Sequence, residues 1–200
     1  MAISPSQPKQ ARAHATRRRL LDAAVEELLE HGYVGLTTPA VAARAGVSRG
    51  AQQNHFPHKT TLVAEAVRHL ALRQCEELRE RVADVPRGRA RVQAGLDILF
   101  EQYSGPLFAA VVELSLAARG DADLRAVIAT EERTVAQAMQ ETATVIFDDD
   151  FPATREAART WASVLAAIRG LALLKLLGRP PDAVDRQWPA TRRQLLELLT

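Results

Sequence analysis

The sequence of 200 residues is poor in cysteine, in aromatic residues and in long apolar runs. Its one cysteine, Cys75, cannot form an internal disulfide or a cysteine-based zinc cluster, and a lone thiol suits a reducing compartment. The first ten residues are polar and contain two prolines, so no secretory signal is expected. The most apolar stretch, residues 161–177, is short for a bilayer span and contains Arg169 and Lys175, as a buried helix would. We therefore expect a soluble, cytoplasmic protein that does not enter a membrane.

Signatures of catalysis and of metal binding are also missing. The sequence has no glycine-rich phosphate loop and no nucleophile motif with a recognisable set of partners. The five histidines lack the helical spacing of metal ligands, and the three consecutive aspartates at 148–150 are typical of a solvated loop between helices. The sequence predicts that the protein is not an enzyme and that it has no cofactor and no metal site.

Alternating strand patterns are absent, whereas helical periodicity is present throughout. From residue 18, apolar residues recur at i, i+1, i+4 and i+5 with acidic residues opposite them, which predicts an amphipathic helix that Gly32 is placed to end. Proline and glycine breaks divide the chain after residue 57 into six further helical segments: 58–84, 88–103, 107–118, 122–147, 153–177 and 182–199. The predicted fold class is all-α, with about nine helices.

Two short helices joined by a tight turn are predicted between these regions. Thr38 is placed as the N-cap of the first, with Pro39 at its first helical position and Gly46 as its stop. Ser48 is placed as the N-cap of the second, which ends near residue 56.

The formal net charge of +2 is unevenly distributed. Residues 1–60 hold eight basic and four acidic side chains, and the rest of the chain holds 18 basic and 20 acidic ones, so the formal charges are +4 and −2. A basic N-terminal part favours a polyanionic partner.

A series of motifs lies in this basic part, and their order and spacing are specific. They are His31-Gly32-Tyr33 at the end of an amphipathic helix, Leu36-Thr37-Thr38, the run VAARAGVSRG at 41–50, His55-Phe56, Lys59 and Leu62. In this pattern the segment 17–67 resembles the DNA-binding domain of the TetR family of transcriptional regulators. The resemblance implies a flexible basic leader at 1–14, a three-helix helix-turn-helix domain at 15–60, and a helical effector-binding and dimerisation domain at 61–200.

The resemblance implies base contacts at the start of the second short helix and backbone contacts around it. Arg49 suits guanine, Gln53 or Asn54 suits adenine, and Ala51 can meet a thymine methyl group. The expected DNA-binding residues are Arg17, Thr38, Ser48, Arg49, Gly50, Ala51, Gln53, Asn54, His55 and Lys59.

Several interpretations in this region stay open. Family members commonly carry an aromatic residue at the position of Gln53 and a hydrophobic residue at that of Gln52, so Gln52 is either a DNA contact or a partly buried hydrogen-bonding residue. The arginines at 17–19 form either a basic arm that reaches phosphates or a minor groove, or a helix start with solvated side chains. Arg49 is either a base contact or a solvated surface charge, and Arg44 has no assigned role.

The C-terminal part carries two further candidate sets. The expected ligand-binding residues are Phe100, Tyr103, Phe108, Glu113, Phe147 and Trp161, with Gln102, Thr142 and Arg169 as further polar groups on apolar faces. The alternative is that these are ordinary core aromatics and half-exposed polar groups. The expected dimer-interface residues are Ala162, Ala166, Gly170, Leu174, Trp188 and Leu195, because small residues at four-residue spacing permit close helix approach and symmetric operators require a dimer. Here the alternative is packing within one subunit.

The implied function is that of a ligand-responsive transcriptional regulator, a repressor that a small molecule releases from a pseudo-palindromic operator. The expected partners are a double-stranded DNA operator, a small-molecule effector and a second copy of the chain. A DNA-binding regulator without a small-molecule effector is the alternative.

Overall fold

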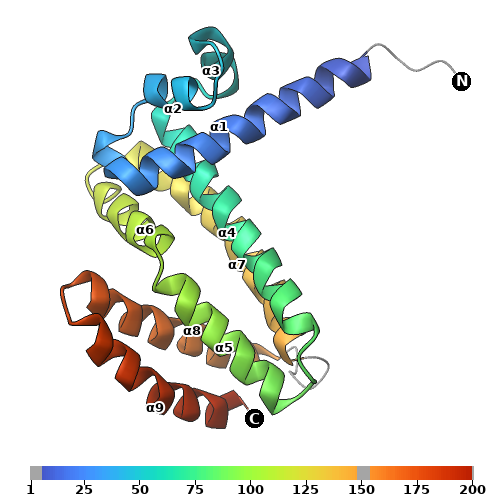
Figure 1. Ribbon diagram of the computed structural model, residues 1–200, viewed down its shortest axis with the longest axis vertical. Coiled ribbons are helices and arrows are strands. Elements are labelled where there is room, and N and C mark those ends of the chain that lie inside the picture. Colours follow the sequence, from blue (N-terminus) through green and yellow to red (C-terminus); the bar gives the residue numbers. More distant parts are fainter. Residues whose placement is uncertain (1–5, 148–153, 200) are drawn as a thin grey trace, which may run out of the picture. The chain divides into compact units, whose positions relative to one another are not determined.

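The computed structural model describes residues 6–147 and 154–199, which form nine α-helices and no strand (Figure 1). The all-α prediction is therefore confirmed for this part of the chain. The helices are α1 (Ser6–Gly35), α2 (Thr38–Arg44), α3 (Arg49–His55), α4 (Lys59–Ala83), α5 (Arg89–Tyr103), α6 (Pro106–Ala117), α7 (Ala122–Phe147), α8 (Arg155–Leu176) and α9 (Pro181–Leu199). Helix α1 begins at Ser6, so residues 6–14 of the segment predicted to be a flexible leader are helical.

The chain divides into two compact units, each with its own core. The first comprises Met1–Leu70 and Ala110–Thr134, and the second comprises Ala71–Ala109 and Val135–Thr200. Helices α4, α6 and α7 each contribute residues to both units. The predicted assignment of functions to 15–60 and 61–200 remains a prediction.

The core of the first unit is built on the apolar face of α1. Most of this face is buried as the i, i+1, i+4, i+5 pattern predicted, with Leu20 and Ala24 fully enclosed, whereas Leu29 at its end is 38% exposed. Its partners in the same cluster come from α2, from the residue after α3, and from α4, and they are Val41, Phe56, Leu62 and Val63. The two short helices are thereby anchored to α1 and α4 by one small hydrophobic core.

The core of the second unit is formed by α5, α8 and α9 together with the adjoining parts of α4 and α7. Two aromatic pairs lie within it: Phe100 and Trp188 stack with ring centroids 4.3 Å apart, and Phe147 meets Trp161 edge to face at 5.3 Å. Helices α8 and α9 form a helical hairpin against α5 (Figure 1).

Helix α8 requires a correction to the sequence analysis. Among the described helices it alone is long and apolar enough to cross a membrane by length and composition, although its stretch was expected to be too short. Its apolar face, which includes Trp161, Val164 and Ile168, is buried in the core of the second unit, as in the core helix of a soluble protein.

Candidate nucleic-acid interface

Helices α2 and α3 are connected by a turn whose geometry follows from local sequence. Gly46 lies in the left-handed region with a φ of 62°, and the N–H groups of Gly46 and Val47 donate to the carbonyls of Ala43 and Ala42, both at 3.0 Å. This pair of bonds is the Schellman arrangement that ends a helix and redirects the chain. The Ser48 hydroxyl then caps α3 by accepting a hydrogen bond from the Ala51 N–H at 3.2 Å, as predicted.

The predicted N-cap of α2 was wrong by one residue. Thr37, not Thr38, adopts an extended conformation, and its hydroxyl accepts from the Ala40 N–H at 3.3 Å. An N-cap oxygen reaches the amide three residues later, and only Thr37 stands at that distance from Ala40. Thr38 is the first residue of α2, followed by Pro39.

Helix α3 has one buried and one exposed face. On the buried face, Gln52 is only 6% exposed and its amide donates to the Phe56 carbonyl at 2.7 Å. Of the two interpretations of Gln52, a DNA contact or a buried hydrogen-bonding residue, the structure supports the second. On the other face, Arg49, Gly50, Gln53 and Asn54 are exposed, whereas Ala51 and His55 are half-buried. The outward face thus carries one cation and two amides, groups that match base edges in a major groove.

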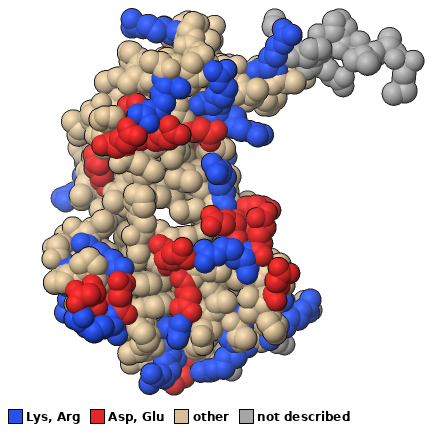
Figure 2. Space-filling view, viewed as in Figure 1, with Lys and Arg blue, Asp and Glu red and all other residues tan. Residues whose placement is uncertain are grey.

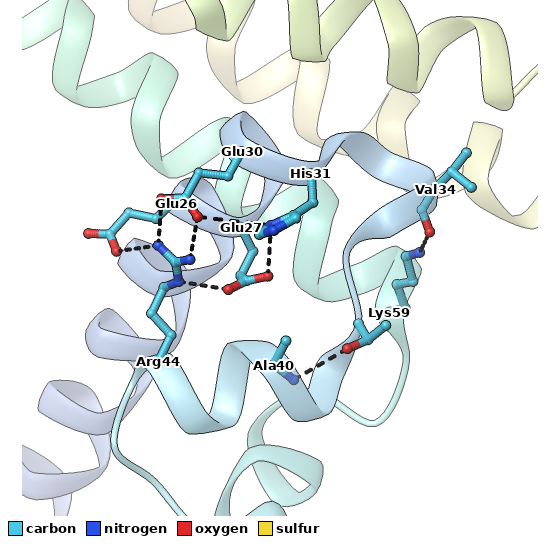
Figure 3. Close-up of polar contacts among 9 residues, drawn as sticks. Glu26, Glu27, Glu30, His31, Val34, Ala40, Arg44 and Lys59 are labelled. Carbon is cyan, nitrogen blue, oxygen red and sulfur yellow. Dashed lines mark hydrogen bonds and ion pairs between the residues drawn. The ribbon is translucent and has the colours of Figure 1, made fainter.

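A fork of ion pairs holds α2 against α1 (Figure 3). The Arg44 Nε donates to Glu27 at 2.7 Å, and its two terminal nitrogens reach Glu26 and Glu30 at 3.3 and 2.5 Å. Glu27 is buried, and its other oxygen lies 3.3 Å from Nδ1 of His31. Hydrogen bonds to Glu30, then to Glu27, raise the pKa of Arg44, and the bond from Arg44 lowers the pKa of Glu30.

Arg44 is thus a structural residue that the sequence analysis left unassigned. The available signal was the spacing of residues 26, 27 and 30, which places three carboxylates on one side of α1. In the space-filling view a row of acidic side chains lies over this part of α1, while basic side chains lie over α3 and along the preceding part of α1 (Figure 2).

Two of the arginines at the start of the α1 apolar face make contacts within the first unit. Arg17 pairs with Glu65 of α4, and its guanidinium lies 4.6 Å from the centre of the Phe56 ring. Arg19 donates to the carbonyl of Ala45 and, at 3.0 Å, to that of Gly46. Arg17 is half-buried, whereas Arg18 and Arg19 are exposed. The contacts of Arg17 and Arg19 connect this part of α1 to α4 and to the turn after α2, a role that neither alternative of the sequence analysis included.

Lys59 also makes contacts within the unit. Its ammonium donates to the Val34 carbonyl at 3.4 Å (Figure 3) and lies 4.6 Å from the centre of the Tyr33 ring. Partial burial lowers the pKa of Lys59, and the carboxylate of Glu113 opposes that shift.

Of the six predicted ligand-binding residues, five lie in the second unit and one does not. Tyr103 meets Phe108 edge to face at 5.4 Å, and Arg169 donates to the Tyr103 hydroxyl at 2.8 Å. Phe100 is covered by Trp188, and Phe147 by Trp161. Glu113 was misplaced by the sequence analysis: it lies in the first unit and accepts a hydrogen bond from the Tyr33 N–H at 2.8 Å.

The polar groups of the second unit differ in whether they are satisfied. Gln102 donates to the Gln74 carbonyl at 2.9 Å, and the hydroxyl of buried Thr142 donates to the Ala138 carbonyl at 2.8 Å, so both serve the fold. By contrast, the indole N–H of Trp161 and the hydroxyl of Ser104 are buried without a hydrogen-bond partner in the described structure.

The predicted dimer-interface residues also divide into two groups. Ala162, Ala166 and Gly170 are exposed on one face of α8. Trp188 and Leu195 were expected on the interface, but they are 7% and 6% exposed within the single chain, and Leu174 packs against the same core. The reason for the error is that α9 turns its apolar face inward onto α5 and α8.

The aspartates at 148–150 lie outside the described residues. Within the described ranges, no group of three or more histidine, cysteine or acidic side chains is arranged to hold a metal ion.

Comparison with known sequences finds a family match over part of the chain. Residues 20–66 match the family described as bacterial regulatory proteins, tetR family. CymR, an HTH-type transcriptional regulator of Pseudomonas putida, is 37% identical over 124 residues, which are 62% of this chain and 61% of CymR. The chain spans about 60% of the length of the curated relatives it matches first.

Solved structures of similar fold cover nearly the whole chain. A transcriptional regulator from Rhodococcus sp. Rha1 is 26% identical, with a TM-score of 0.64 and with 90% of this chain and 96% of that chain covered. The multidrug binding protein EbrR in complex with proflavin is 25% identical, with a TM-score of 0.57 and with 92% and 99% covered.

The fold and the exposed face of α3 define the class of helix-turn-helix regulators. Within this class, residues 20–66 of the chain match the tetR family of bacterial regulatory proteins. The relatives that the chain resembles are named HTH-type transcriptional regulators.

Proposed function

We propose that this protein is a cytoplasmic transcriptional regulator that binds a pseudo-palindromic DNA operator as a homodimer. The observation that carries this proposal is the exposed polar face of α3, whose opposite face is held in the core of the first unit by Gln52 and Phe56. One helix of this kind per subunit enters a major groove, and a twofold axis places the two helices in successive grooves.

The contacts that we propose follow the exposed positions of α3. Arg49 donates to the O6 and N7 atoms of guanine, and Gln53 or Asn54 pairs with adenine. Ala51 and His55 lie at the edge of this face, and Gly50 has no atom within 4 Å of an added Cβ, so the backbone is open to DNA there. Thr38 and Ser48 contribute hydroxyls to the phosphates.

Arg17 and Lys59 have a supporting part in this proposal. Both side chains are held by contacts inside the first unit, to Glu65 and to the Val34 carbonyl. Their role is to fix α1 and α4 relative to the recognition helix, with their charge adding to the positive potential that attracts DNA.

We further propose that the protein is a repressor and that a small molecule bound in the second unit releases it from DNA. The unpartnered indole N–H of Trp161 supports such a site, because a buried donor without an acceptor costs about 1–3 kcal/mol and an acceptor on a ligand would recover that energy. The similarity to EbrR, a multidrug binding protein, supports it also. Phe147, which meets the Trp161 ring, and the Tyr103–Phe108 pair supply apolar surface in the second unit.

The dimer would form through the exposed small residues of α8. Ala162, Ala166 and Gly170 lie on one face, and exposed Leu177 and Leu198 supply apolar surface on the second unit. A four-helix bundle of α8 and α9 from two copies would bury this surface.

Selection of binding sites from random double-stranded DNA tests the proposed function. We expect enrichment of inverted repeats whose half-site centres are about 34–36 Å apart, one helical turn. Because each neutralised phosphate releases counterions, six phosphate contacts would reduce affinity roughly 10³-fold between about 50 and 200 mM salt. Absence of any enriched sequence with the wild-type protein would exclude this function.

Arg49→Ala provides the residue-level test on the selected operator. Loss of a bidentate base contact should weaken operator binding by about 1–3 kcal/mol and leave random-DNA binding less affected. An equal loss on both DNAs would reassign Arg49 to the phosphate backbone.

The effector proposal needs its own measurement. Pools of small molecules are added to the operator complex to find a compound that dissociates it. The thermal stabilisation by this compound is then measured for wild type and for Trp161→Phe, which keeps an aromatic ring but lacks the indole N–H. We expect reduced stabilisation of the variant, whereas failure of every pool would favour a regulator without an effector.

A further inference from the structure

The junction between α1 and α2 depends on an unusual backbone conformation at Gly32. With a φ of 67° and a ψ of 177°, Gly32 interrupts α1 in a region of backbone space that is essentially restricted to glycine. The Gly32 carbonyl then accepts from the Leu36 N–H at 3.1 Å, and fully buried Leu36 leads directly to the N-cap Thr37. The direction in which α2 and α3 leave α1 is therefore set at this residue.

The interruption is closed by a side chain from a distant part of the sequence. The Tyr33 N–H donates to the Oε1 atom of Glu113, which lies in α6 and 80 residues further along the chain, at 2.8 Å. The carboxylate occupies the space beside Gly32: a Cβ added there would lie 2.7 and 2.8 Å from its two oxygens. The carboxylate of Glu113 can approach the backbone this closely because Gly32 has no side chain.

A second side chain holds the next residue of the same junction. Lys59, the first residue of α4, donates to the Val34 carbonyl, and its ammonium lies over the Tyr33 ring. One N–H and one carbonyl in consecutive residues are therefore satisfied by charged groups of opposite sign from two other helices.

We propose that Glu113 is a positioning residue for DNA recognition. Its carboxylate fixes the Gly32–Tyr33 junction and so fixes the orientation of α2 and α3, without touching DNA. This inference rests on the proposed function, and it extends the set of residues that support DNA recognition to one outside the helix-turn-helix. The role also differs from the ligand contact that the sequence suggested for Glu113.

The test compares operator affinity among three variants, using the operator selected with the wild-type protein. Glu113→Ala removes the acceptor, Glu113→Gln keeps an uncharged acceptor oxygen, and Glu132→Ala removes an exposed glutamate of α7 as a control. We expect the operator Kd to rise about tenfold in Glu113→Ala, to rise less in Glu113→Gln, and to stay unchanged in Glu132→Ala.

Two additional readouts separate positioning from general stability. Random-DNA affinity should change less than operator affinity in Glu113→Ala, and amide hydrogen exchange at Tyr33 should accelerate while exchange in the helices of the second unit does not. If Glu113→Ala unfolds at a lower temperature but its folded form binds the operator as wild type does, the positioning role is wrong. If the wild-type protein itself selects no operator, the proposed function fails instead.

Discussion

Gln52 and Gln53 are chemically identical neighbours that the helix turns to opposite sides. Gln52 donates to the buried Phe56 carbonyl and so closes the end of α3, whereas Gln53 is exposed on the face with Arg49. Because 3.6 residues make one turn, adjacent positions point about 100° apart, enough to place one in the core and one in solvent.

Substitution of these two glutamines should have separate effects. Gln52→Ala leaves the buried Phe56 carbonyl without its donor and is expected to lower the free energy of unfolding by about 1–3 kcal/mol. Gln53→Ala should change stability by less than about 0.5 kcal/mol, as exposed substitutions do, and weaken operator binding. Urea titration and a DNA-binding isotherm on both variants measure the difference. Equal stability losses would contradict the two-faced description of α3.

The sequence could suggest a role for some arginines of the first unit and not for others. Arg49 stands on an exposed face that periodicity reveals. Arg17, Arg19 and Arg44 find their partners on other helices, and no local pattern states that Arg19 reaches the carbonyls of Ala45 and Gly46.

At the scale of the helices, α9 is attached to α5 by a polar clamp beside an aromatic stack. One Asp97 oxygen accepts from the Trp188 indole N–H at 2.7 Å, and the carboxylate also binds Arg192 at 2.6 Å. The Trp188 ring stacks on Phe100 with an interplanar angle of 7°. Asp97 lies 91 positions from Trp188 and 95 from Arg192, so the attachment depends on the tertiary fold.

Two substitutions of Trp188 separate the stack from the clamp. Trp188→Ala removes the whole ring from a buried site and is expected to cost about 3–5 kcal/mol of stability. Trp188→Phe keeps a stacking ring and loses one hydrogen bond, at a cost of about 1 kcal/mol. Chemical unfolding at one fixed protein concentration tests this, because dimerisation adds to apparent stability. A Trp188→Ala variant as stable as Trp188→Phe would mean that the ring is not packed as described.

Helix boundaries were largely predictable, and their errors have local causes. Gly46 and Ser48 were assigned correctly because positive φ and N-capping are properties of single residues. The N-cap of α2 was missed because two adjacent threonines precede Pro39. The start of α1 was missed because residues 6–14 carry no apolar face that would indicate a helix.

At the scale of the whole molecule, some of the eight basic side chains in the first sixty residues are used inside the fold. Arg44 is matched by three carboxylates of α1, and Arg17 by Glu65. The charge that remains available to a polyanion lies on exposed residues such as Arg18 and Arg49. The charge count therefore points to the N-terminal part of the chain, but it does not tell which of its basic side chains stay exposed.

Dimerisation through α8 is the main prediction at this scale. Ala166→Glu introduces an unpaired carboxylate into each side of the proposed interface, at a cost of roughly 3 kcal/mol or more per subunit, and should yield monomers in sedimentation. Ala126→Glu, the same change at an exposed alanine of α7, should leave the dimer intact. A dimeric Ala166→Glu protein would place the interface elsewhere.

The sequence by itself determined the helical class, the helix-turn-helix and the outward face of α3, because hydrophobic periodicity, capping and glycine stops act over one or two helical turns. Only the tertiary structure decided that Trp188 and Leu195 face inward, that Arg44 bridges three glutamates, and that Glu113 closes the junction at Gly32. The physical reason is range: these contacts join residues from different helices, up to 91 positions apart, and the packing of the helices determines which residues meet.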